Sequence, residues 1–465
     1  MSTSGEVSRL REVYLSGEAS PVEIARSHLE TIASRNAEIN AFSLVDEVVA
    51  IETARASEAR YRRGESLGPL DGIPVTIKDT LNVAGWPTRR GSRTTSDAPA
   101  MADAVSIARL RAAGAVLLGK TTTPEFAWNG LTQNLPDGVT SSSLDPTLHA
   151  GGSSGGAAAA TGLGMGVVGI GTDAAGSVRI PAAFCGVVGF KPTFATIPLD
   201  PFPAAFWQLP HIGPIARSVR DAVVAASIMS GPASSDSLSL FQTSLERRLE
   251  QEWPMRRPRV GIPAGIDRYL EPPVQRAWDH ALRVLGSTLT LAPVEIPIDE
   301  SRDIVATLYR LGCLYAVSLV PEQKTAELDP AILEFVEPVR SIATDELLAL
   351  QRRREEIASQ AALLMTTDID VLLTPTMPCL PPHIESAASR DVDWFRRCPF
   401  TPLYNLTRGP ALSVPWPHPD AAELPIGLQI GAAPGNDGLA VAAAALIERA
   451  AGSYLGHAGA DRCAK

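Results

Sequence analysis

Two serines and a lysine are the residues whose types and spacing could carry out chemistry together. Lys78 ends the apolar run Val75–Ile77, Ser153 lies in GGSSGG, and Ser177 follows in GTDAAGS. A lysine can act as general base for a serine when burial favours its uncharged amine. The three residues therefore predict nucleophilic catalysis. Lys78 is also followed by Asp79, so an ordinary ion pair between these neighbours is the alternative interpretation.

The glycine-rich stretch around both serines first suggests a phosphate-binding loop. A loop of the G-x-x-x-x-G-K-[ST] type is excluded because no lysine follows these glycines. Gly164, Gly166 and Gly169 match G-x-G-x-x-G, but a dinucleotide site needs a strand before the glycines and a helix after them. Here residues 157–161 favour a helix before the glycines, and residues 167–170 favour a strand after them. The order is inverted, which argues against a dinucleotide site.

The segment Gly151–Gly155 also matches G-x-S-x-G, the motif of a nucleophile elbow with Ser153 as nucleophile. That motif places the serine on a sharp turn from a strand to a helix, whereas the preceding Asp145–Pro146 pair makes a poor strand. The elbow would also need a histidine, and no downstream histidine lies in a telling context. A further alternative makes Ser153 a plain helix N-cap.

Three segments together resemble the amidase signature family. They are GIPVTIKD with Lys78, GGSSGG with Ser153, and GTDAAGSVRIPAAFCGVVGFKPT with Ser177. Shorter segments agree, namely LGKTTTPEF, GPIARSVRDA, DVLLTPTMP and LPIGLQIGA, and the resemblance spans residues 65–450. It implies an α/β protein with the amidase signature fold, a central mixed twisted β-sheet covered by α-helices on both faces.

The resemblance also implies a role for each site residue. Ser177 would be the nucleophile, and Ser153, after a cis Gly152–Ser153 bond, would relay its proton to neutral Lys78. Backbone amides would form the oxyanion hole, those of Ala174, Ala175, Gly176 and Ser177. Further side chains would hold the loop and the relay in register: Ser154, Asp173 and Arg179.

The sequence departs from the family pattern at two places. Family members usually show Gly-Gly-Ser at the nucleophile, whereas this chain has Ala175-Gly176-Ser177. The added methyl group of Ala175 either narrows the space beside the substrate carbonyl or is absorbed by the loop. The segment Gln133–Pro146 lacks the usual T-E-N-S…N-P-W-D pattern, so the resemblance does not imply a particular substrate.

The predicted function is that of an amidase, which hydrolyses amides, among them aryl amides, carbamates (urethanes) or esters, through an acyl-enzyme on Ser177. The alternative is the glutaminase subunit of a tRNA-dependent amidotransferase. An apolar or aromatic substrate group is suggested by residues near the site: Phe126, Trp128, Asn129, Phe202, Phe206 and Trp207. The irregular segment 198–214, which supplies some of them, is either a surface loop or a pocket wall.

Helices and strands must position these residues, and their signals alternate along the chain. Ser20–Glu23 is a capping box with proline at the first helical position, so a helix begins there. A second helix is predicted over Asp46–Arg62, and a short strand over Val75–Ile77. A helix over 103–114, with Gly114 as its stop, then precedes a strand over Ala115–Leu118. This alternation is typical of a layered α/β protein.

The pattern continues with the strands RVGIPA, Ile369–Leu373 and LPIGLQIGA and the helices Val274–Leu285 and Gly438–Ala451. We expect an N-terminal helical region over residues 1–64 packed on the core, a single amidase signature domain over 65–455, and a C-terminal tail over 456–465.

Composition limits the classes of partner. The chain of 465 residues is 45% hydrophobic and 20% charged, with a net charge of -10. Because phosphate neutralisation needs clustered basic residues, we expect no nucleic-acid partner. The cysteines are scattered without a C-x-x-C pair: Cys185, Cys313, Cys379, Cys398 and Cys463. We expect a cytoplasmic monomer or homodimer that acts on a small amide or carbamate without a membrane, metal or cofactor.

Overall fold

The computed structural model describes residues 5–200, 206, 208–250, 258–386 and 391–462. Its strands are β1 (Phe42–Val45), β2 (Pro74–Lys78), β3 (Val116–Thr121), β4 (Gln133–Asn134), β5 (Gly138–Val139), β6 (Val168–Asp173), β7 (Val188–Lys191), β8 (His211–Ala216), β9 (Arg259–Pro263), β10 (Thr290–Val294), β11 (Val371–Pro375), β12 (Ala411–Trp416) and β13 (Ile426–Gly431).

Its helices are α1 (Glu6–Ser16), α2 (Pro21–Ile39), α3 (Glu47–Arg63), α4 (Val105–Ala112), α5 (Gly155–Gly162), α6 (Arg179–Phe184), α7 (Val219–Met229), α8 (Leu245–Leu249), α9 (Pro272–Leu285), α10 (Ile298–Ser318), α11 (Pro330–Val336), α12 (Thr344–Thr367), α13 (Leu403–Leu406) and α14 (Asp437–Arg462). The short 3₁₀ turn η1 (Glu125–Ala127) also concerns the site.

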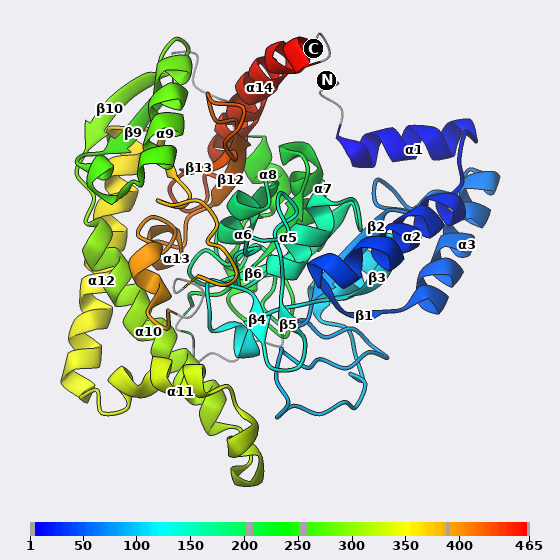
Figure 1. Ribbon diagram of the computed structural model, residues 1–465, viewed down its shortest axis with the longest axis horizontal. Coiled ribbons are helices and arrows are strands. Elements are labelled where there is room, and N and C mark those ends of the chain that lie inside the picture. Colours follow the sequence, from blue (N-terminus) through cyan, green and yellow to red (C-terminus); the bar gives the residue numbers. More distant parts are fainter. Residues whose placement is uncertain (1–4, 201–205, 207, 251–257, 387–390, 463–465) are drawn as a thin grey trace.

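One large mixed sheet organises the molecule (Figure 1). Its strand order is β1-β3-β2-β6-β8-β7-β12-β13-β11-β9-β10. The strand β2 runs parallel to both of its neighbours, β3 and β6, whereas β6 and β8 are antiparallel. Because parallel neighbours end at the same edge of a sheet, the last residues of β2 and β6 lie close together.

Helices cover both faces of this sheet, as the resemblance implied. Successive residues of a strand point to opposite faces, and in β3 the side chain of Leu117 joins a different apolar cluster from those of Val116 and Leu118. The cluster with Leu117 contains residues of α1, α4, α7, α9 and α14, and the other contains residues of α2, α3 and α5. Burial of apolar surface on both sides therefore holds the layers together.

A third apolar cluster lies beside the turn that carries Ser177. It joins Tyr309 of α10, Phe335 of α11 and Ile357 of α12 to Ala175, and all of these residues are buried. The helices α10, α11 and α12 stand at one side of the molecule (Figure 1). Through this cluster, helices from the second half of the chain pack against residues of the first half.

The predicted elements near the site are present with small shifts at their ends. The capping box at Ser20 and Glu23 is complete, and the side chain of Asp46 caps α3. The closing helix differs more. It was expected to end at Ala451, with a tail from residue 456, but α14 continues to Arg462. Alanine has the highest helix propensity, and a single glycine costs only about 1 kcal/mol, so the alanine-rich segment tolerates its glycines.

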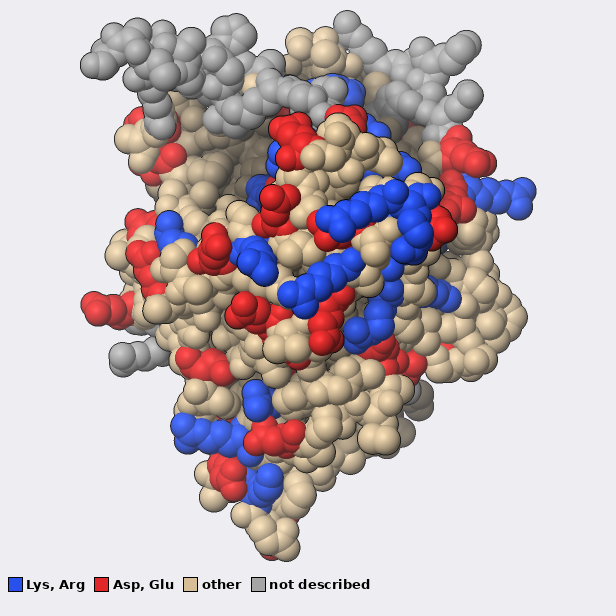
Figure 2. Space-filling model, turned by 90° about the vertical axis from the view of Figure 1, so that its right-hand side faces the viewer, with Lys and Arg blue, Asp and Glu red and all other residues tan. Residues whose placement is uncertain are grey.

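Charged side chains of both signs are mixed on the face that Figure 2 shows. Exposed helix positions also carry ion pairs one turn apart, as Arg35 with Glu38 (3.3 Å) and Arg62 with Glu58 (3.1 Å). Such exposed pairs contribute little to stability. Within the described part of the chain, no helix combines the length and apolarity that crossing a membrane requires.

Candidate active site

Lys78 is the last residue of β2, and its side chain is completely buried. Its amine donates hydrogen bonds to Ser153 Oγ (2.6 Å) and to Thr172 Oγ1 (2.9 Å). The carboxylate of Asp79 instead pairs with Lys120, at 2.7 Å. The alternative of an ion pair between Lys78 and Asp79 is therefore wrong, because another lysine holds that carboxylate.

The surroundings of Lys78 favour its uncharged form. Burial lowers the pKa of Lys78 well below its ordinary value, and the negative charge of Asp173 opposes this shift only in part. A neutral amine carries a lone pair that can accept a proton. Since the nearest hydroxyl is that of Ser153, the arrangement allows a proton to pass from Ser153 to Lys78.

Ser153 lies in the turn that leads into α5. The Gly152–Ser153 peptide bond is cis, as the resemblance implied. The residue at the N-cap of α5 is Ser154, and its side chain makes no capping hydrogen bond, so Ser153 is not the N-cap. A Cβ atom on Gly152 would lie 2.8 Å from the carbonyl carbon of Leu131, which explains why a glycine precedes the serine.

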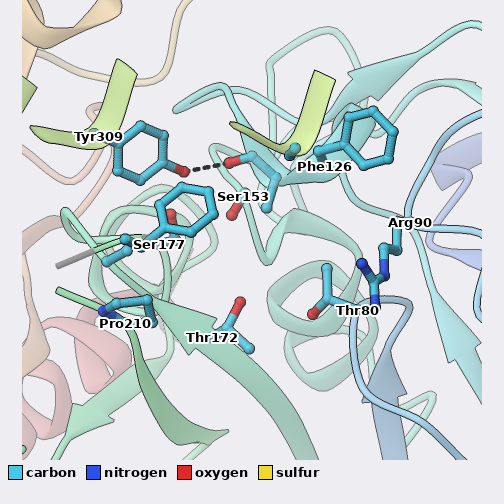
Figure 3. A pocket seen from close by; sticks show the side chains of 12 residues that line it. Thr80, Arg90, Phe126, Ser153, Thr172, Ser177, Pro210 and Tyr309 are labelled. Atoms are coloured by element: carbon cyan, nitrogen blue, oxygen red, sulfur yellow. Dashed lines mark hydrogen bonds between the residues drawn. The ribbon is translucent and has the colours of Figure 1, made fainter. Parts of the chain in front are cut away.

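Ser177 lies in the turn between β6 and α6, and its side chain lines the same pocket as Ser153. Figure 3 shows both hydroxyls at this pocket. The Ser177 Oγ atom has no hydrogen-bond partner among the described residues. Its carbonyl accepts a hydrogen bond from the Ser154 amide, at 3.1 Å. This backbone hydrogen bond joins the turns that carry the two serines. The Ser177 hydroxyl remains available to a substrate.

An interior ion pair fixes the turn that carries Ser177. Both carboxylate oxygens of Asp173 accept from the guanidinium of Arg179, each at 2.9 Å, and Asn405 Nδ2 donates to Asp173 at the same distance. Burial alone would raise the pKa of Asp173, but the charge and hydrogen bonds of Arg179, together with Lys191 and Asn405, lower that pKa below its ordinary value. Arg179 also donates to Gln429 Oε1, at 2.6 Å. The turn is therefore tied to β13.

Ser154 supports the site from the other side. Its hydroxyl donates to the carbonyl of Thr172 (3.2 Å) and accepts from the amide of the same residue (3.3 Å). Thr172 in turn receives a hydrogen bond from Lys78. The predicted supporting residues are thus near the site: Ser154 is bonded to Thr172, and Asp173 and Arg179 form the ion pair behind the turn that carries Ser177.

The amides predicted for the oxyanion hole do not all have the same surroundings. The N–H of Gly176 donates to Asp173 Oδ1 at 2.8 Å, so it is already used. The amides of Ala174, Ala175 and Ser177 have no hydrogen-bond partner within the described residues. Gly176 adopts φ of +120°, a conformation that favours glycine. The Gly176 amide therefore differs from its predicted role in the oxyanion hole. It holds the shape of the turn and is not a free donor.

The pocket at the two serines has a largely apolar lining. It encloses about 630 Å³ including its opening to solvent, the size of a small-molecule site. The Tyr309 hydroxyl donates to the carbonyl of Ala127, as the dashed line in Figure 3 marks. Burial raises the pKa of Tyr309 well above its ordinary value, so this hydroxyl stays protonated. The apolar lining residues are Phe126, Ala127, Ala174, Phe206, Pro210, Tyr309 and Ala316.

The family model described as "Amidase" matches residues 23–441. The chain belongs to the amidase signature family. An acylamidase of Rhodococcus erythropolis is 33% identical over 448 residues, which cover 93% of this chain and 92% of that protein. A glutamyl-tRNA(Gln) amidotransferase subunit of Chloroflexus aggregans is 30% identical over 91% of this chain and 92% of that protein.

The fold of this amidase is also that of solved family members. The crystal structure of a bacterial aryl acylamidase of the amidase signature family superposes with a TM-score of 0.83 at 27% identity, over 96% of both chains. The chain is accordingly an amidohydrolase that acts on C–N bonds. The match at residue 23 begins well before residue 65, where the resemblance read from the motifs begins, and so takes in α2 and α3.

The alternatives for the glycine-rich stretch can now be decided. The helix α5 precedes the glycines and the strand β6 follows them, so the order needed for a dinucleotide site is absent. No histidine is among the described residues that line the pocket, which removes the support for a nucleophile elbow at Ser153. The Ala175 side chain is fully buried in the third apolar cluster, and Ala174 lines the pocket instead. The loop thus absorbs the added methyl group of Ala175.

The predicted aromatic pocket is present in part. Phe126 and Phe206 line the pocket, and Phe206 belongs to the segment 198–214, for which surface loop and pocket wall were the alternatives. Where the described part of this segment reaches the site, it therefore forms a wall of the pocket. The predicted pocket residues Phe202 and Trp207 lie outside the described residues.

Trp128 and Asn129 are near the site without lining the pocket. The Trp128 ring packs on Phe335 with 5.1 Å between centroids, and Asn129 Oδ1 accepts from the amide of Leu131 at 3.1 Å. Both side chains are almost completely buried. They shape the turn before Ser153 and belong to the core rather than to the substrate surface.

Sequence reasoning missed several residues of this amidase site. Thr172 contacts Lys78, and its position just before Asp173 in the motif was an available signal. Thr80, Arg90 and Tyr309 also line the pocket. Thr80 follows Lys78 closely, but nothing in the pattern marks the other two residues. Among the described residues, no His, Cys, Asp and Glu side chains are grouped as ligands of a metal ion.

Proposed function

We propose that this amidase cleaves small amides through an acyl-enzyme on Ser177, with Ser153 as proton relay and Lys78 as general base. The observation that carries the proposal is the 2.6 Å hydrogen bond between Lys78 Nζ and Ser153 Oγ, at a pocket that the Ser177 hydroxyl shares. A buried neutral amine can withdraw a proton through the relay and leave Ser177 nucleophilic.

In the proposed cycle Ser177 Oγ attacks the carbonyl carbon and passes its proton through Ser153 to Lys78. The oxyanion is held by the unpaired amides of Ala174, Ala175 and Ser177, each of which typically contributes roughly 3 kcal/mol to transition-state stabilisation. The C–N bond then breaks, and Ser153 returns the proton to the leaving nitrogen. Water, deprotonated along the same path, hydrolyses the ester at Ser177 and restores the enzyme.

The proposed substrates carry an aromatic or other apolar group, as aryl amides do, and carbamates or esters of similar shape are included. The apolar lining from Phe126, Phe206 and Tyr309 supports this class, because such walls favour an apolar group over water. A relative named acylamidase and a solved structure named aryl acylamidase point the same way. The enzyme would act on free small molecules, as a monomer or homodimer, without nucleic acid or a membrane.

The second candidate is glutamine hydrolysis as the glutaminase component of a tRNA-dependent amidotransferase. It is favoured by the relatives named for such an amidotransferase, one of which is 30% identical over most of both chains. A glutamine site needs a negative group for the substrate ammonium. The described residues that line the pocket include no Asp or Glu, and this favours the amidase function.

A substrate panel tests the proposal. Purified protein is incubated with acetanilide, an aryl carbamate, an aryl ester, an aliphatic amide and glutamine, and product release is followed by chromatography. We expect turnover of the aryl substrates and its loss in Ser177→Ala, with the fold verified by circular dichroism. Hydrolysis of glutamine alone, or activity that survives in Ser177→Ala, would contradict the proposal.

A further inference from the structure

Two polar side chains of the pocket, Arg90 and Thr80, have no role in the proposed chemistry. Both line the pocket that Ser153 and Ser177 share. In Figure 3, Arg90 and Thr80 lie across the pocket from Ser177, and Ser153 lies between them in this view. A cation and a hydroxyl in a largely apolar lining need a polar partner, because leaving them unpaired is unfavourable.

The Thr80 hydroxyl lacks such a partner within the described residues. The residue is only 8% exposed, and its Oγ1 atom makes no hydrogen bond. Buried hydroxyls are almost always hydrogen-bonded, so each exception needs an explanation. Thr80 follows Lys78 at the end of β2, and its backbone amide is bonded to the Lys78 carbonyl at 2.8 Å. Its position relative to the base is therefore fixed.

The backbone of Arg90 is also fixed, between two walls of the pocket. Its amide donates to the carbonyl of Asp79 (3.0 Å), and its carbonyl accepts from the amide of Phe126 (2.8 Å). Arg90 adopts φ of +55°, which is uncommon outside glycine, so the chain keeps an arginine at a place where its backbone is not favoured. The Arg90 side chain is half-buried and lines the pocket.

The charged side chains next to Arg90 in the sequence and in space are paired with other residues. Asp79 pairs with Lys120 at 2.7 Å and accepts from the Arg89 amide. The Arg89 guanidinium pairs with Asp97 at 2.6 Å, on the outside of the protein. Within the described residues, no hydrogen bond or ion pair engages the guanidinium of Arg90. Its positive charge is therefore available to a ligand.

We propose that Arg90 and Thr80 form a subsite for a carboxylate carried by the amine portion of the substrate. The inference rests on the proposed function and names a substrate class, amides of amino acids whose acid group points away from the cleaved bond. A guanidinium can bind a carboxylate through two parallel N–H···O bonds, and the Thr80 hydroxyl adds a third donor.

The amine portion is assigned because of the position of Ser153. In the proposed cycle Ser153 protonates the leaving nitrogen, so the amine leaves on the Ser153 side of Ser177. Arg90 and Thr80 lie beyond Ser153 on that side (Figure 3). The acyl portion instead faces Ser177 and the apolar wall with Tyr309. The substrate class that we propose is therefore an amide of a rigid aromatic amino acid, with its acid group directed to Arg90 and Thr80.

The test compares matched substrates. The probes are para-acetamidobenzoate and para-acetotoluidide, in which a methyl group replaces the carboxylate, and the readout is the ratio of their kcat/KM values. We expect the wild type to prefer the acid and Arg90→Met to lower this ratio roughly 10- to 100-fold, the range of a charge-assisted hydrogen bond. Arg89→Met removes the same charge from the adjacent position and should leave the ratio unchanged.

Binding of the product para-aminobenzoate, measured by calorimetry, tests the subsite without turnover. Its Kd should rise in Arg90→Met and in Thr80→Val, and Arg90→Lys should restore part of the affinity. Equal ratios in wild type and Arg90→Met, together with unchanged Kd, would overturn the proposal. A preference for succinanilate, whose acid is on the acyl side, would overturn the assignment to the amine portion. Failure to cleave any probe, with Arg90-dependent binding retained, would reject the proposed function and keep the subsite.

Discussion

Replacing Lys78 by methionine removes the proposed base and little else. The two side chains have similar length, and Lys78 is completely buried, so methionine can occupy its space. The substitution removes two hydrogen bonds that the Lys78 amine donates, one to Ser153 Oγ (2.6 Å) and one to Thr172 Oγ1 (2.9 Å). Loss of a positioned general base typically lowers the rate roughly 100- to 10,000-fold. We expect kcat to fall within this range.

The stability of Lys78→Met should change much less than its activity. Leaving a buried hydroxyl without its partner costs about 1–3 kcal/mol, and methionine avoids the cost of burying an amine. These effects oppose each other, so Tm should move by a few degrees at most. The assay follows para-nitroaniline released from para-nitroacetanilide, with Tm measured on the same preparations.

The pH dependence gives a second readout of the same substitution. The base must be neutral, so wild-type activity should rise as pH increases through the lowered pKa of Lys78. Between that pKa and the ordinary 10.5, the unfolded chain binds a proton that the folded protein has lost. The free energy of unfolding should therefore also rise with pH in this window, and Lys78→Met should lack this contribution.

Lys191→Met is the matched control for removal of a buried lysine. Within the described residues its amine donates only to backbone carbonyls, those of Pro192 and Gly409, and it is not among the residues that line the pocket. We expect this variant to lose stability and to keep turnover within tenfold of the wild type. If Lys78→Met kept more than a tenth of wild-type kcat, or if its pH profile matched that of the wild type, Lys78 would not be the base.

Further predictions concern the nucleophile turn. Asp173→Asn leaves Arg179 as an uncompensated buried cation, so the free energy of unfolding should fall by about 3–5 kcal/mol, measured by urea denaturation; an unchanged midpoint would show that this ion pair does not stabilise the turn. Gly176→Ala places a Cβ atom 2.4 Å from Thr401 Oγ1 at a φ of +120°, so kcat should fall at least tenfold while Ala175→Gly, at a buried methyl outside the pocket, should have a smaller effect on kcat. Equal losses in these two variants would contradict the placement of the Ala175 side chain.

The sequence was sufficient where chemistry and spacing were both constrained. Lys78, Ser153 and Ser177 could be brought together because each lies in a long motif, and the glycines around them leave room for close backbone contacts. The helix and strand order near the site followed from capping residues and apolar runs. The expected end of the closing helix at Ala451 was too early, because α14 continues through its glycines to Arg462.

The pocket walls could not be predicted in the same way. Trp128 looked like a substrate contact because it is a large aromatic residue near the motif, but its ring packs into the core. Tyr309 lies far along the chain on an ordinary amphipathic helix, and only the packing of α10 brings it to Ser177. The place of Arg90 at the pocket could not be predicted, because it depends on the geometry of its turn, with a φ of +55° that the sequence does not reveal.

The hydrogen bond from the Ser154 amide to the Ser177 carbonyl fixes the turns of the two serines relative to each other. In the proposed cycle every protein atom that moves a proton comes from residues 78–177, whereas Tyr309 and Ala316 of the pocket lining come from α10. A change in that helix can therefore reshape what enters the pocket without altering how the two hydroxyls and the amine face one another. For protein engineering, α10 is the segment to exchange between relatives when a new substrate is sought and the reaction is to be kept.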